Sequence, residues 1–388
     1  MRILSRTIAV SRCRQIKTNL IINANSPNCI DTNMCRFYQH KISFQWHSNT
    51  RRSANETIQR NFSDGAPTNT NNNEDDGDEK PLILSQKDGV LTLTLNRPKQ
   101  RNALNLALLQ DLRSTLMQLK QQQRHNDDGN GNGDGEVNRY DRDIRAVIIQ
   151  ANGPAFCSGH DLKELILSNH HTNSSTTYST TTTYSTTETQ KAQQIFHICS
   201  EVMTLLRTIP QPTIAAIHGI ATAAGCQLAA STDLTIASDN ASFATPGVDI
   251  GLFCSTPAVP LLRILPRKIA NDMLFTGRVL CANEALRYGL VSRVIHSYED
   301  DEDHKHGGGD TRVKEEASAI ARLIASKSAH AVQMGKETLY EQVESVTMEE
   351  AYGIATSAMV RGMESDDAIY GIESFLKKER PIWNQKHR

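Results

Sequence analysis

FCSGHDLKE (156–164) and HGIATAAGCQLA (218–229) are two stretches in which the chain is expected to pass from a strand, through a glycine-containing turn, into a helix. Gly159 permits a tight turn in the first stretch, because glycine adopts backbone conformations that other residues avoid. Small residues in the second stretch let a ligand approach the start of a helix, where unpaired backbone N–H groups point outward. Taken alone, small residues at a helix start more often reflect close packing between elements than a ligand site. Their chemical meaning therefore depends on the sequence around them.

Expected strands and helices alternate around these two stretches. Runs of aliphatic and β-branched residues predict the strands. They are LILSQKDGVLTLTLN (82–96, two strands around the turn at Asp88-Gly89), IRAVIIQA (144–151), PTIAAIHG (212–219), DLTIASD (233–239) and the extended segment SFATPG (242–247). Helical spacing of apolar residues predicts one helix that begins at Asn102, and helices dominate after Thr256, the last over 312–327, 330–346 and 348–375. This order indicates an α/β core followed by a helical C-terminal subdomain.

Polar tracts suggest how the chain is divided. Arg and Lys outnumber Asp and Glu ten to two in residues 1–60, a composition typical of an organellar transit peptide, with a disordered basic tail as the alternative. Residues 61–80 read as a disordered linker, and we expect the core over 81–295. Disordered insertions are expected inside this core near 125–139 and 169–189. An acidic, Gly-rich loop and the helical subdomain are expected over 296–388.

Composition excludes several classes of protein. The formal net charge of −1 gives no electrostatic basis for binding nucleic acid, and no apolar run approaches the roughly 20 residues that span a bilayer. The eight cysteines form no CxxC pair and are expected to be free thiols in a reducing compartment. His304 and His306 are expected to lie in a solvated loop rather than to bind a metal. We therefore expect no metal site, no nucleic acid partner and no membrane span.

The motifs together resemble those of the enoyl-CoA hydratase/isomerase (crotonase) family. The stretches that carry the resemblance are LTLNRPKQRNAL (93–104), AFCSGHDLKEL (155–165), the continuous segment 209–252, MLFTGRVLCANEALRYGLVSRVI (273–295) and FLKKERPIW (375–383). The resemblance implies an α/β fold, with a superhelical core of ββα units and a C-terminal helical subdomain used in oligomerisation. It implies that coenzyme A thioesters are the substrate or ligand, with no separate cofactor, and that the protein is a homotrimer or a dimer of trimers.

The resemblance also implies the residues of a thioester site. The backbone N–H groups of His160 and Ala224 would form an oxyanion hole, which stabilises negative charge on the thioester oxygen. The coenzyme A moiety would lie along two segments that flank this hole. The residues expected to bind it are Arg97, Asn102, Ala103, Leu104, His160, Asp161, Leu162 and Lys163.

The catalytic carboxylates of the family's hydratases are missing. Hydration requires one group that takes a proton from water and one that gives a proton to the substrate, and two glutamates divide this work. The resemblance places the first glutamate at Gln227 and the second at Gly247. Neither residue can transfer a proton. Asp249 is a candidate substitute, because residues i and i+2 share a face in an extended segment; capping of neighbouring groups is the alternative.

Two further positions keep alternative interpretations. The imidazole of His160 can act as an acid or base near neutral pH, or it can be a polar plug in the coenzyme A channel. Cys254-Ser255 can supply a nucleophile or form a wall of the pocket, and nothing in the sequence pairs either residue with a base.

Three functions follow as alternatives. The first is a mitochondrial matrix protein of fatty-acid and lipid metabolism that uses the oxyanion hole for a reaction other than hydration. The second is a non-catalytic acyl-CoA binder or regulator of lipid metabolism. The third is a residual enoyl-CoA hydratase.

Overall fold

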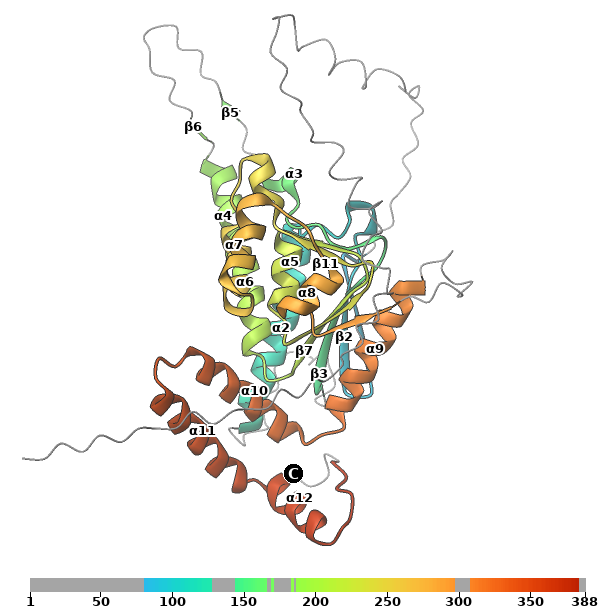
Figure 1. The fold of residues 1–388 in the computed structure, drawn as a ribbon, viewed down its shortest axis with the longest axis vertical. Coiled ribbons are helices and arrows are strands. Elements are labelled where there is room, and N and C mark those ends of the chain that lie inside the picture. The colour runs from blue at the N-terminus through green and yellow to red at the C-terminus, as the bar shows by residue number, and fades with distance from the viewer. Residues whose placement is uncertain are drawn as a thin grey trace, which may run out of the picture. The chain divides into compact units, whose positions relative to one another are not determined.

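A six-stranded sheet organises the described part of the protein (Figure 1). The computed structural model describes residues 80–127, 144–165, 169–170, 183–184, 186–296 and 308–383. The sheet has the order β1 (Leu82–Lys87), β2 (Val90–Leu95), β3 (Ala146–Ala151), β7 (Thr213–Ile217), β9 (Leu234–Ser238) and β12 (Arg293–Ile295). Only β1 runs antiparallel, and the expected turn that joins it to β2 is present, with positive φ at Asp88 and Gly89. Positive φ at both central residues suits a tight hairpin.

Successive residues of the central strands point into different parts of the core. Val147 and Ile149 of β3 pack with helices α2 (Leu106–Asp127) and α4 (Thr186–Thr208) in the larger apolar cluster. Ala146 and Ile148 pack with helix α9 (Gly308–Ala325) in the smaller cluster. This alternation is the period of a strand buried on both faces. The sheet is therefore covered by α2 and α4 on one face and by α9 on the other.

A second, smaller sheet carries the site motifs. Its strands have the order β11 (Leu280–Cys281), β10 (Ser242–Ala244), β8 (Ile220–Thr222) and β4 (Ala155–Cys157). Strand β4 leads to α3 (Leu162–Leu165), and β8 leads to α5 (Ala224–Ala230). Because β4 and β8 are parallel neighbours, the two helix starts that follow them lie at the same edge of the sheet. The motifs are far apart in sequence but adjacent in space.

The remaining elements are mainly helical. They are η1 (Pro98–Gln100), η2 (Pro246–Ile250), α6 (Ser255–Ile264), α7 (Arg267–Thr276), α8 (Ala282–Tyr288), α10 (Ala329–Glu344), α11 (Met348–Met363), α12 (Asp366–Leu376) and the short strand pair β5 (Asn169–His170) and β6 (Thr183–Tyr184). No described helix combines the length and the apolar character that crossing a bilayer requires.

Several expected boundaries differ from the structure. The helix expected from Asn102 begins at Leu106, because the Asn105 side chain accepts the Leu108 N–H (3.1 Å) and so caps the first turn. It then runs to Asp127, into the expected insertion over 125–139. The helix expected over 348–375 is two helices, because Ser365 caps a new one by accepting the Ala368 N–H.

The core extends past the boundary expected at residue 295. Helix α9 packs directly on the six-stranded sheet, and only α10 to α12 lie beyond it. The expected transit peptide (1–60), residues 61–79 of the expected linker and the histidine-containing loop around 304–306 lie outside the described residues, as do parts of both expected insertions.

A buried ion pair joins α10 to the core. Lys336, with only 6% of its surface exposed, contacts the carboxylate of Asp233 at 2.7 Å. Its ammonium group also donates to the carbonyl oxygens of Leu206 (2.8 Å) and Gln211 (2.9 Å). Burial lowers the pKa of Lys336, and the Asp233 carboxylate opposes that shift. The hydroxyl of Tyr340 donates to the same carboxylate at 2.6 Å, so two residues of α10 hold one acid of the core.

Candidate functional site

Ala224 is the first residue of α5, and its backbone N–H lies at the start of this helix. The residue before the helix is Ala223, whose φ of 49° and ψ of −117° are unusual for a residue with a side chain. The N–H of Ala223 donates to the carbonyl of Ala244 (2.9 Å), and the N–H of Gln227 donates to the carbonyl of Ala223 (3.0 Å). The N–H of Ala224 has no acceptor among the described residues. It is one of the unpaired donors of a helix start.

His160 presents a second available N–H. It pairs with Leu104 in an isolated parallel bridge, in which the Leu104 N–H donates to Gly159 (2.7 Å) and the Asp161 N–H donates to Leu104 (3.1 Å). This pattern uses the neighbours of His160 and leaves its own N–H outside the bridge. The bridge therefore fixes the backbone at residue 160 while keeping its donor free within the described structure.

Close packing between glycine and alanine residues brings the two donors together. A Cβ added at Gly159, which has a φ of +102°, would lie 2.9 Å from the Cβ of Ala223 and 3.5 Å from the nitrogen of Ala224. A Cβ added at Gly225 would overlap the carbonyl oxygen of Cys157. Both glycines are therefore required for the two turns to touch. Two adjacent N–H groups of this kind suit an oxyanion, and their role as an oxyanion hole stays a prediction.

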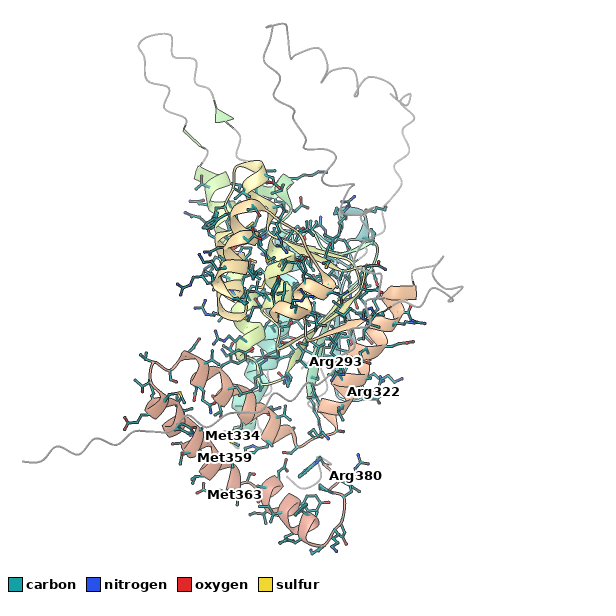
Figure 2. All side chains as sticks on the ribbon, in the orientation of Figure 1. Arg293, Arg322, Met334, Met359, Met363 and Arg380 are labelled. Atoms are coloured by element: carbon teal, nitrogen blue, oxygen red, sulfur yellow. The ribbon has the colours of Figure 1, made fainter. Side chains whose placement is uncertain are left out.

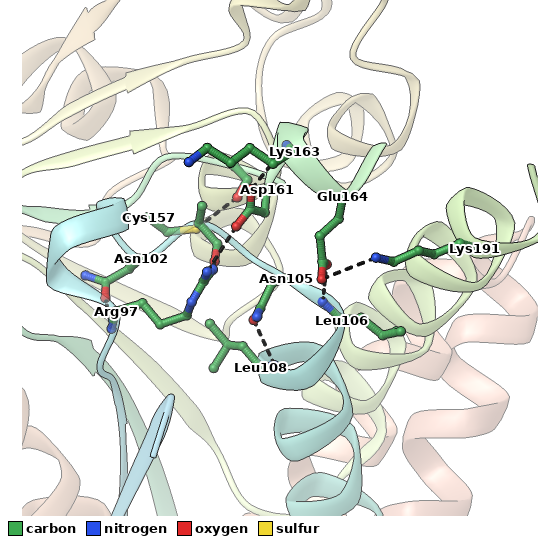
Figure 3. Close-up of polar contacts among 12 residues, drawn as sticks. Arg97, Asn102, Asn105, Leu106, Leu108, Cys157, Asp161, Lys163, Glu164 and Lys191 are labelled. Atoms are coloured by element: carbon green, nitrogen blue, oxygen red, sulfur yellow. Dashed lines mark hydrogen bonds and ion pairs between the residues drawn. The ribbon is translucent and has the colours of Figure 1, made fainter. Parts of the chain in front are cut away.

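The segments expected to bind coenzyme A are connected by side chains (Figure 3). The guanidinium of Arg97 forms an ion pair with Asp161 (3.0 Å) and donates to the carbonyl oxygen of Ala103. Asn102 is fully buried at a φ of 55°, accepts the Arg97 N–H (2.8 Å), and donates from its amide to the carbonyls of Asn152 and Ala155 (2.8 Å each). These contacts fold the 97–104 segment against the 160–163 segment.

Three of the residues expected to bind coenzyme A contribute no side chain to these contacts. Leu104 is buried in the main core, whereas Leu162 and Lys163 are exposed on the short helix α3. The N–H of Lys163 donates to the carboxylate of Asp161 at 3.2 Å. Only Lys163 of these three carries an exposed positive charge, and its contact with a phosphate of coenzyme A stays a prediction.

Cys254 fills the space beside Gly247. A Cβ added at Gly247 would lie 2.8 Å from the Sγ atom of Cys254 and 3.0 Å from the carbonyl oxygen of Leu252. The thiol therefore stands where the side chain of the second glutamate would begin. Burial raises the pKa of Cys254, so the thiol is neutral at physiological pH, and a contact with the backbone of Gly247 opposes that shift only in part. Nothing in the sequence indicated this contact, because residues 247 and 254 meet only through the turn of η2.

Gln227 lies one turn into α5 and is almost completely buried, with 3% of its surface exposed. Its Oε1 atom has no hydrogen-bond partner in the part of the chain that the structure describes. The carboxamide can hold a polar group by hydrogen bonding but cannot take its proton.

Asp249 does not share a face with Gly247 in the way the sequence suggested. Residues 246–250 form the 3₁₀ helix η2 rather than an extended segment, so residues two apart point in different directions. The carboxylate of Asp249 lies against Gly277 at the C-terminal end of α7, where a Cβ would be 3.1 Å from its Oδ2 atom. The argument for a substitute carboxylate based on strand geometry was therefore wrong.

The imidazole of His160 is held in an apolar environment. Its ring lies edge-on to that of Phe196 from α4, with centroids 5.0 Å apart. Both ring nitrogens are buried and make no hydrogen bond of ordinary geometry to the described residues. Burial lowers the pKa of His160 to about 4, against a weaker opposing effect of the Leu104 backbone. The ring is therefore neutral at pH 7. Phe196 had no recognisable role in the sequence, because it is one apolar residue among many in a helix.

The cysteines of the described region are free thiols. Burial raises the pKa of Cys157, Cys199 and Cys226 to about 12, which makes them poor nucleophiles. The hydroxyl of Ser255 donates to the carbonyl of Phe253 (3.4 Å) and has no other acceptor in the ranges that the structure describes. Within the described ranges, no group of His, Cys, Asp and Glu residues could hold a metal ion.

Comparisons with known proteins agree with these motifs. A family model described as enoyl-CoA hydratase/isomerase matches residues 136–386. The chain is 41% identical over 309 residues to enoyl-CoA hydratase domain-containing protein 3, mitochondrial, of Rattus norvegicus, covering 79% of this chain and 86% of the relative. The human protein of the same name is 39% identical over 311 residues, covering 80% and 86%.

Solved structures show the same similarity. The crystal structure of the human protein has a TM-score of 0.62 at 39% identity, covering 78% of this chain and 100% of that one. The crystal structure of an enoyl-CoA hydratase from Mycobacterium smegmatis also has a TM-score of 0.62, at 36% identity, covering 79% and 99%. On the matched family model, the identity of these relatives and the shared fold, the chain belongs to the enoyl-CoA hydratase/isomerase family and has the crotonase fold.

Proposed function

We propose that this protein binds acyl-CoA thioesters in the mitochondrial matrix and acts in fatty-acid and lipid metabolism without being an efficient enoyl-CoA hydratase. The observation that carries the proposal is the pair of N–H groups at His160 and Ala224 without an acceptor in the described structure, together with Gln227 and Gly247 at the two positions where the resemblance places carboxylates. Relatives that are 41% and 39% identical over 309 and 311 residues are named mitochondrial, which supports the compartment.

The loss of both carboxylates argues against hydration on chemical grounds. Each acid–base group typically contributes about 10²–10⁴-fold to rate. A carboxamide and a neutral thiol can bind the substrate and exclude water, but neither moves a proton at neutral pH. The paired N–H groups still suit a reaction that passes through an enolate or an oxyanion, such as a decarboxylation, an isomerisation or a thioester cleavage. A non-catalytic acyl-CoA binder is the second candidate, and the same replacements favour it.

Calorimetric titration with butyryl-CoA tests binding, which both candidates require. We expect saturable binding that weakens about 3–10-fold when Lys163 is changed to Ala, because one exposed charge near a phosphate is lost. Lys268→Ala on α7 is the matched control, since Lys268 is also exposed but lies outside the expected coenzyme A segments. No binding by the unmodified protein would reject both candidates.

Turnover distinguishes the two candidates. A panel of enoyl-, malonyl-type and saturated acyl-CoAs should reveal a product if the protein is an enzyme, and none if it is a binder. For hydration, we expect the loss of crotonyl-CoA absorbance to be no faster than in the double variant Gln227→Ala, Asp249→Ala. A clearly faster rate in the unmodified protein would show that it is a hydratase after all.

We also propose that the protein is a homotrimer or a dimer of trimers. Two exposed apolar surfaces support this proposal. The first is formed by Ile250, Leu252, Phe253, Val259, Leu262 and Phe275 around α6 and α7; the second by Val346, Met348, Tyr352, Met359, Met363 and Phe375 on and beside α11 and α12. Figure 2 shows Met334, Met359 and Met363 along α10 and α11. Two different apolar surfaces on one chain suit a head-to-tail contact, which closes into a ring. Light scattering after size-exclusion chromatography should give three or six times the chain mass, and a monomer would refute the assembly.

A further inference from the structure

A cavity between the edge strand β1 and helix α2 has no role in the proposed function. Its volume is about 680 Å³, within the roughly 300–1,000 Å³ range of ligand pockets in proteins. Leu82 and Leu84 of β1 form part of one wall, and Ser114 and Gln118 of α2 form part of the other. None of the residues assigned to the thioester site lines this cavity in the described structure. The cavity is therefore a separate candidate site.

Strand β1 carries backbone groups that no described strand uses. It lies at one end of the six-stranded sheet, so β2 is its only partner strand among the described residues. The Asn96 N–H donates to the Pro81 carbonyl (2.8 Å), so the backbone of residue 81 faces β2. Because this direction alternates along an antiparallel pair, the N–H and carbonyl groups of Leu82 and Leu84 point to the open edge. An edge of this kind is able to pair with another extended chain.

The wall formed by α2 offers hydrogen-bonding side chains. The Oε1 atom of Gln118 is buried and has no hydrogen-bond partner in the part of the chain that the structure describes. Buried polar atoms almost always have a partner, because an unpaired one keeps the full cost of leaving water. Ser114, one turn earlier on the helix, is exposed. A molecule in the cavity would therefore complete this wall with an N–H or O–H group directed at Gln118.

A second copy of this chain does not suit the cavity. Leu82 is buried in the main core and Leu84 packs against it, so both side chains are already in use on the side of the sheet that faces α2. Side chains alternate between the two faces of a strand, so a second β1 paired at the edge would present only these residues and Gln86 to that side. The space beside them would stay empty, which close-packed interiors avoid. The occupant is therefore a chain whose side chains are free to enter the cavity.

The charges of β1 narrow the class of partner. Lys80 and Lys87 lie near its two ends and are exposed, and the strand contains no acidic residue. Lysines on an edge strand disfavour pairing with an arbitrary exposed strand, because their charge has to be matched. An acidic residue in the added strand supplies that match.

We propose that the groove between β1 and α2 binds an extended, acidic peptide segment of another protein, which adds a strand to the six-stranded sheet. The peptide backbone pairs with Leu82 and Leu84, and alternate side chains of the peptide enter the cavity. One of them is apolar and packs against Leu84, and another carries an N–H or O–H donor for Gln118. This mode of recognition takes its affinity from main-chain hydrogen bonds and its specificity from the side-chain pocket. The inference does not depend on acyl-CoA binding.

Selection from a phage-displayed library of random peptides tests the proposal on the full chain. Peptides of about nine residues are long enough to pair along the six residues of β1. We expect the selected peptides to alternate apolar residues with Ser, Thr, Asn or Gln and to carry an acidic residue near one end. Their synthetic forms should bind the protein saturably, as measured by fluorescence anisotropy.

Methylation of the peptide's backbone nitrogens distinguishes an added strand from other modes of binding. Methyl groups on the alternate amides that face β1 should weaken binding about 10-fold or more, because each removes a main-chain hydrogen bond and blocks close approach. Methyl groups on the intervening amides, which face away from the sheet, should change the affinity less than about 2-fold.

Substitutions on α2 assign the binding to this groove. Ser114→Trp should fill the cavity and weaken binding of the selected peptides about 10-fold or more. Gln110→Trp is the matched control and should bind normally, since Gln110 is exposed on the same helix but does not line the cavity. Gln118→Leu should weaken binding about 2–10-fold, the ratio typical of one hydrogen bond. Replacing the donor residue of the peptide by Val should remove this difference between Gln118→Leu and the unmodified protein.

Several outcomes would overturn the inference. They are a selection that yields no peptide preferring the unmodified protein over Ser114→Trp, equal effects of the two sets of N-methyl groups, and a smaller assembly mass of Ser114→Trp in light scattering, which would show that a second copy occupies the groove. If Ser114→Trp does not fold, the two sets of N-methyl groups on the unmodified protein decide the question. Butyryl-CoA should bind Ser114→Trp as it binds the unmodified protein, so failure of this inference and failure of the proposed function are distinguishable.

Discussion

The side chain of Cys254 occupies the space that a side chain at position 247 would need. The Sγ atom of Cys254 and the carbonyl oxygen of Leu252 approach the place where a Cβ at 247 would lie. A glutamate at this position would have to displace the thiol and then push against the backbone. The packing around residue 247 therefore leaves no room for a carboxylate side chain at this position.

Gly247→Glu should lower the free energy of unfolding by about 1–3 kcal/mol, the typical cost of overfilling a packed site. Cys254→Ala in the same chain should recover part of this loss, because the nearer of the two obstructing atoms is removed. Urea unfolding of the wild type, both single variants and the double variant measures the coupling between the two positions. Purely additive effects would mean that the thiol does not obstruct residue 247.

His160 should make stability depend on pH in the weakly acidic range. Its pKa is lowered to about 4 in the folded protein from an ordinary value of 6.5, so the unfolded chain binds more protons between these values. Stability is therefore fully present above pH 6.5 and declines as the pH falls toward 4, by an amount on the order of 2–3 kcal/mol.

Denaturant unfolding of the wild type and of His160→Leu at pH 7 and pH 5 checks this prediction. The variant should lose less stability between the two values, since it has no imidazole to protonate. An identical loss of stability in both proteins would show that groups other than the His160 imidazole cause the pH dependence. His330→Leu is the control for loss of a histidine, because His330 lies on α10, away from the site.

At the scale of elements, the start of α5 depends on its contact with β4. Gly225→Ala should prevent correct folding or cost more than about 3 kcal/mol, because the added methyl group overlaps the backbone carbonyl of Cys157 and neither element can move without separating the sheet from the helix. Gly353→Ala on α11 is the matched control. A Cβ there meets no atom within 4 Å, so the same change should stabilise the protein by about 0.5–1 kcal/mol through helix propensity. Thermal unfolding of both variants measures the difference between their stabilities. A small loss of stability in Gly225→Ala would contradict the close contact between residue 225 and the carbonyl of Cys157.

The sequence predicted which helices and strands form better than it predicted the residues at which they begin and end. The apolar runs of β1, β2, β3, β7 and β9 and the turn at Asp88-Gly89 were found, because strand periodicity and turn residues are local signals. The start of α2 was missed, since Asn102 is held by the carbonyls of Asn152 and Ala155, which are remote in the chain. The break between α11 and α12 was missed because apolar spacing continues through it, and only the Ser365 cap marks the new helix.

The candidate site was predictable only as far as its backbone. The family motifs identify His160 and Ala224, and the structure brings their segments together through Gly159 and Gly225. The position of Cys254 and the true direction of Asp249 depend on the 3₁₀ turn between them. That turn begins at Pro246, ends before Gly251 with positive φ, and packs against α7, whereas the sequence pattern predicted an extended segment.

At the scale of the whole described unit, Lys336 joins the C-terminal helices to the core. Lys336→Met should cost about 3–5 kcal/mol, because it leaves the Asp233 carboxylate and two carbonyl oxygens without their buried cation. Hydrogen exchange should increase most over 329–376 and around Asp233, while the central strands β3 and β7 stay protected. Lys377→Met is the control, since its ion pair with Glu373 is exposed and contributes little. Uniform loss of protection would show that the lysine supports the whole core rather than this junction.

The crowding at Gly247 also limits what redesign can place there. A chain with acids at both 227 and 247 would need a smaller residue at 254 as well, because the Sγ atom of Cys254 occupies the space beside Gly247. A change at residue 247 alone is expected to weaken folding without adding a proton-transfer pair. Redesign toward such a pair therefore has to begin at residue 254, before an acid is introduced at 247.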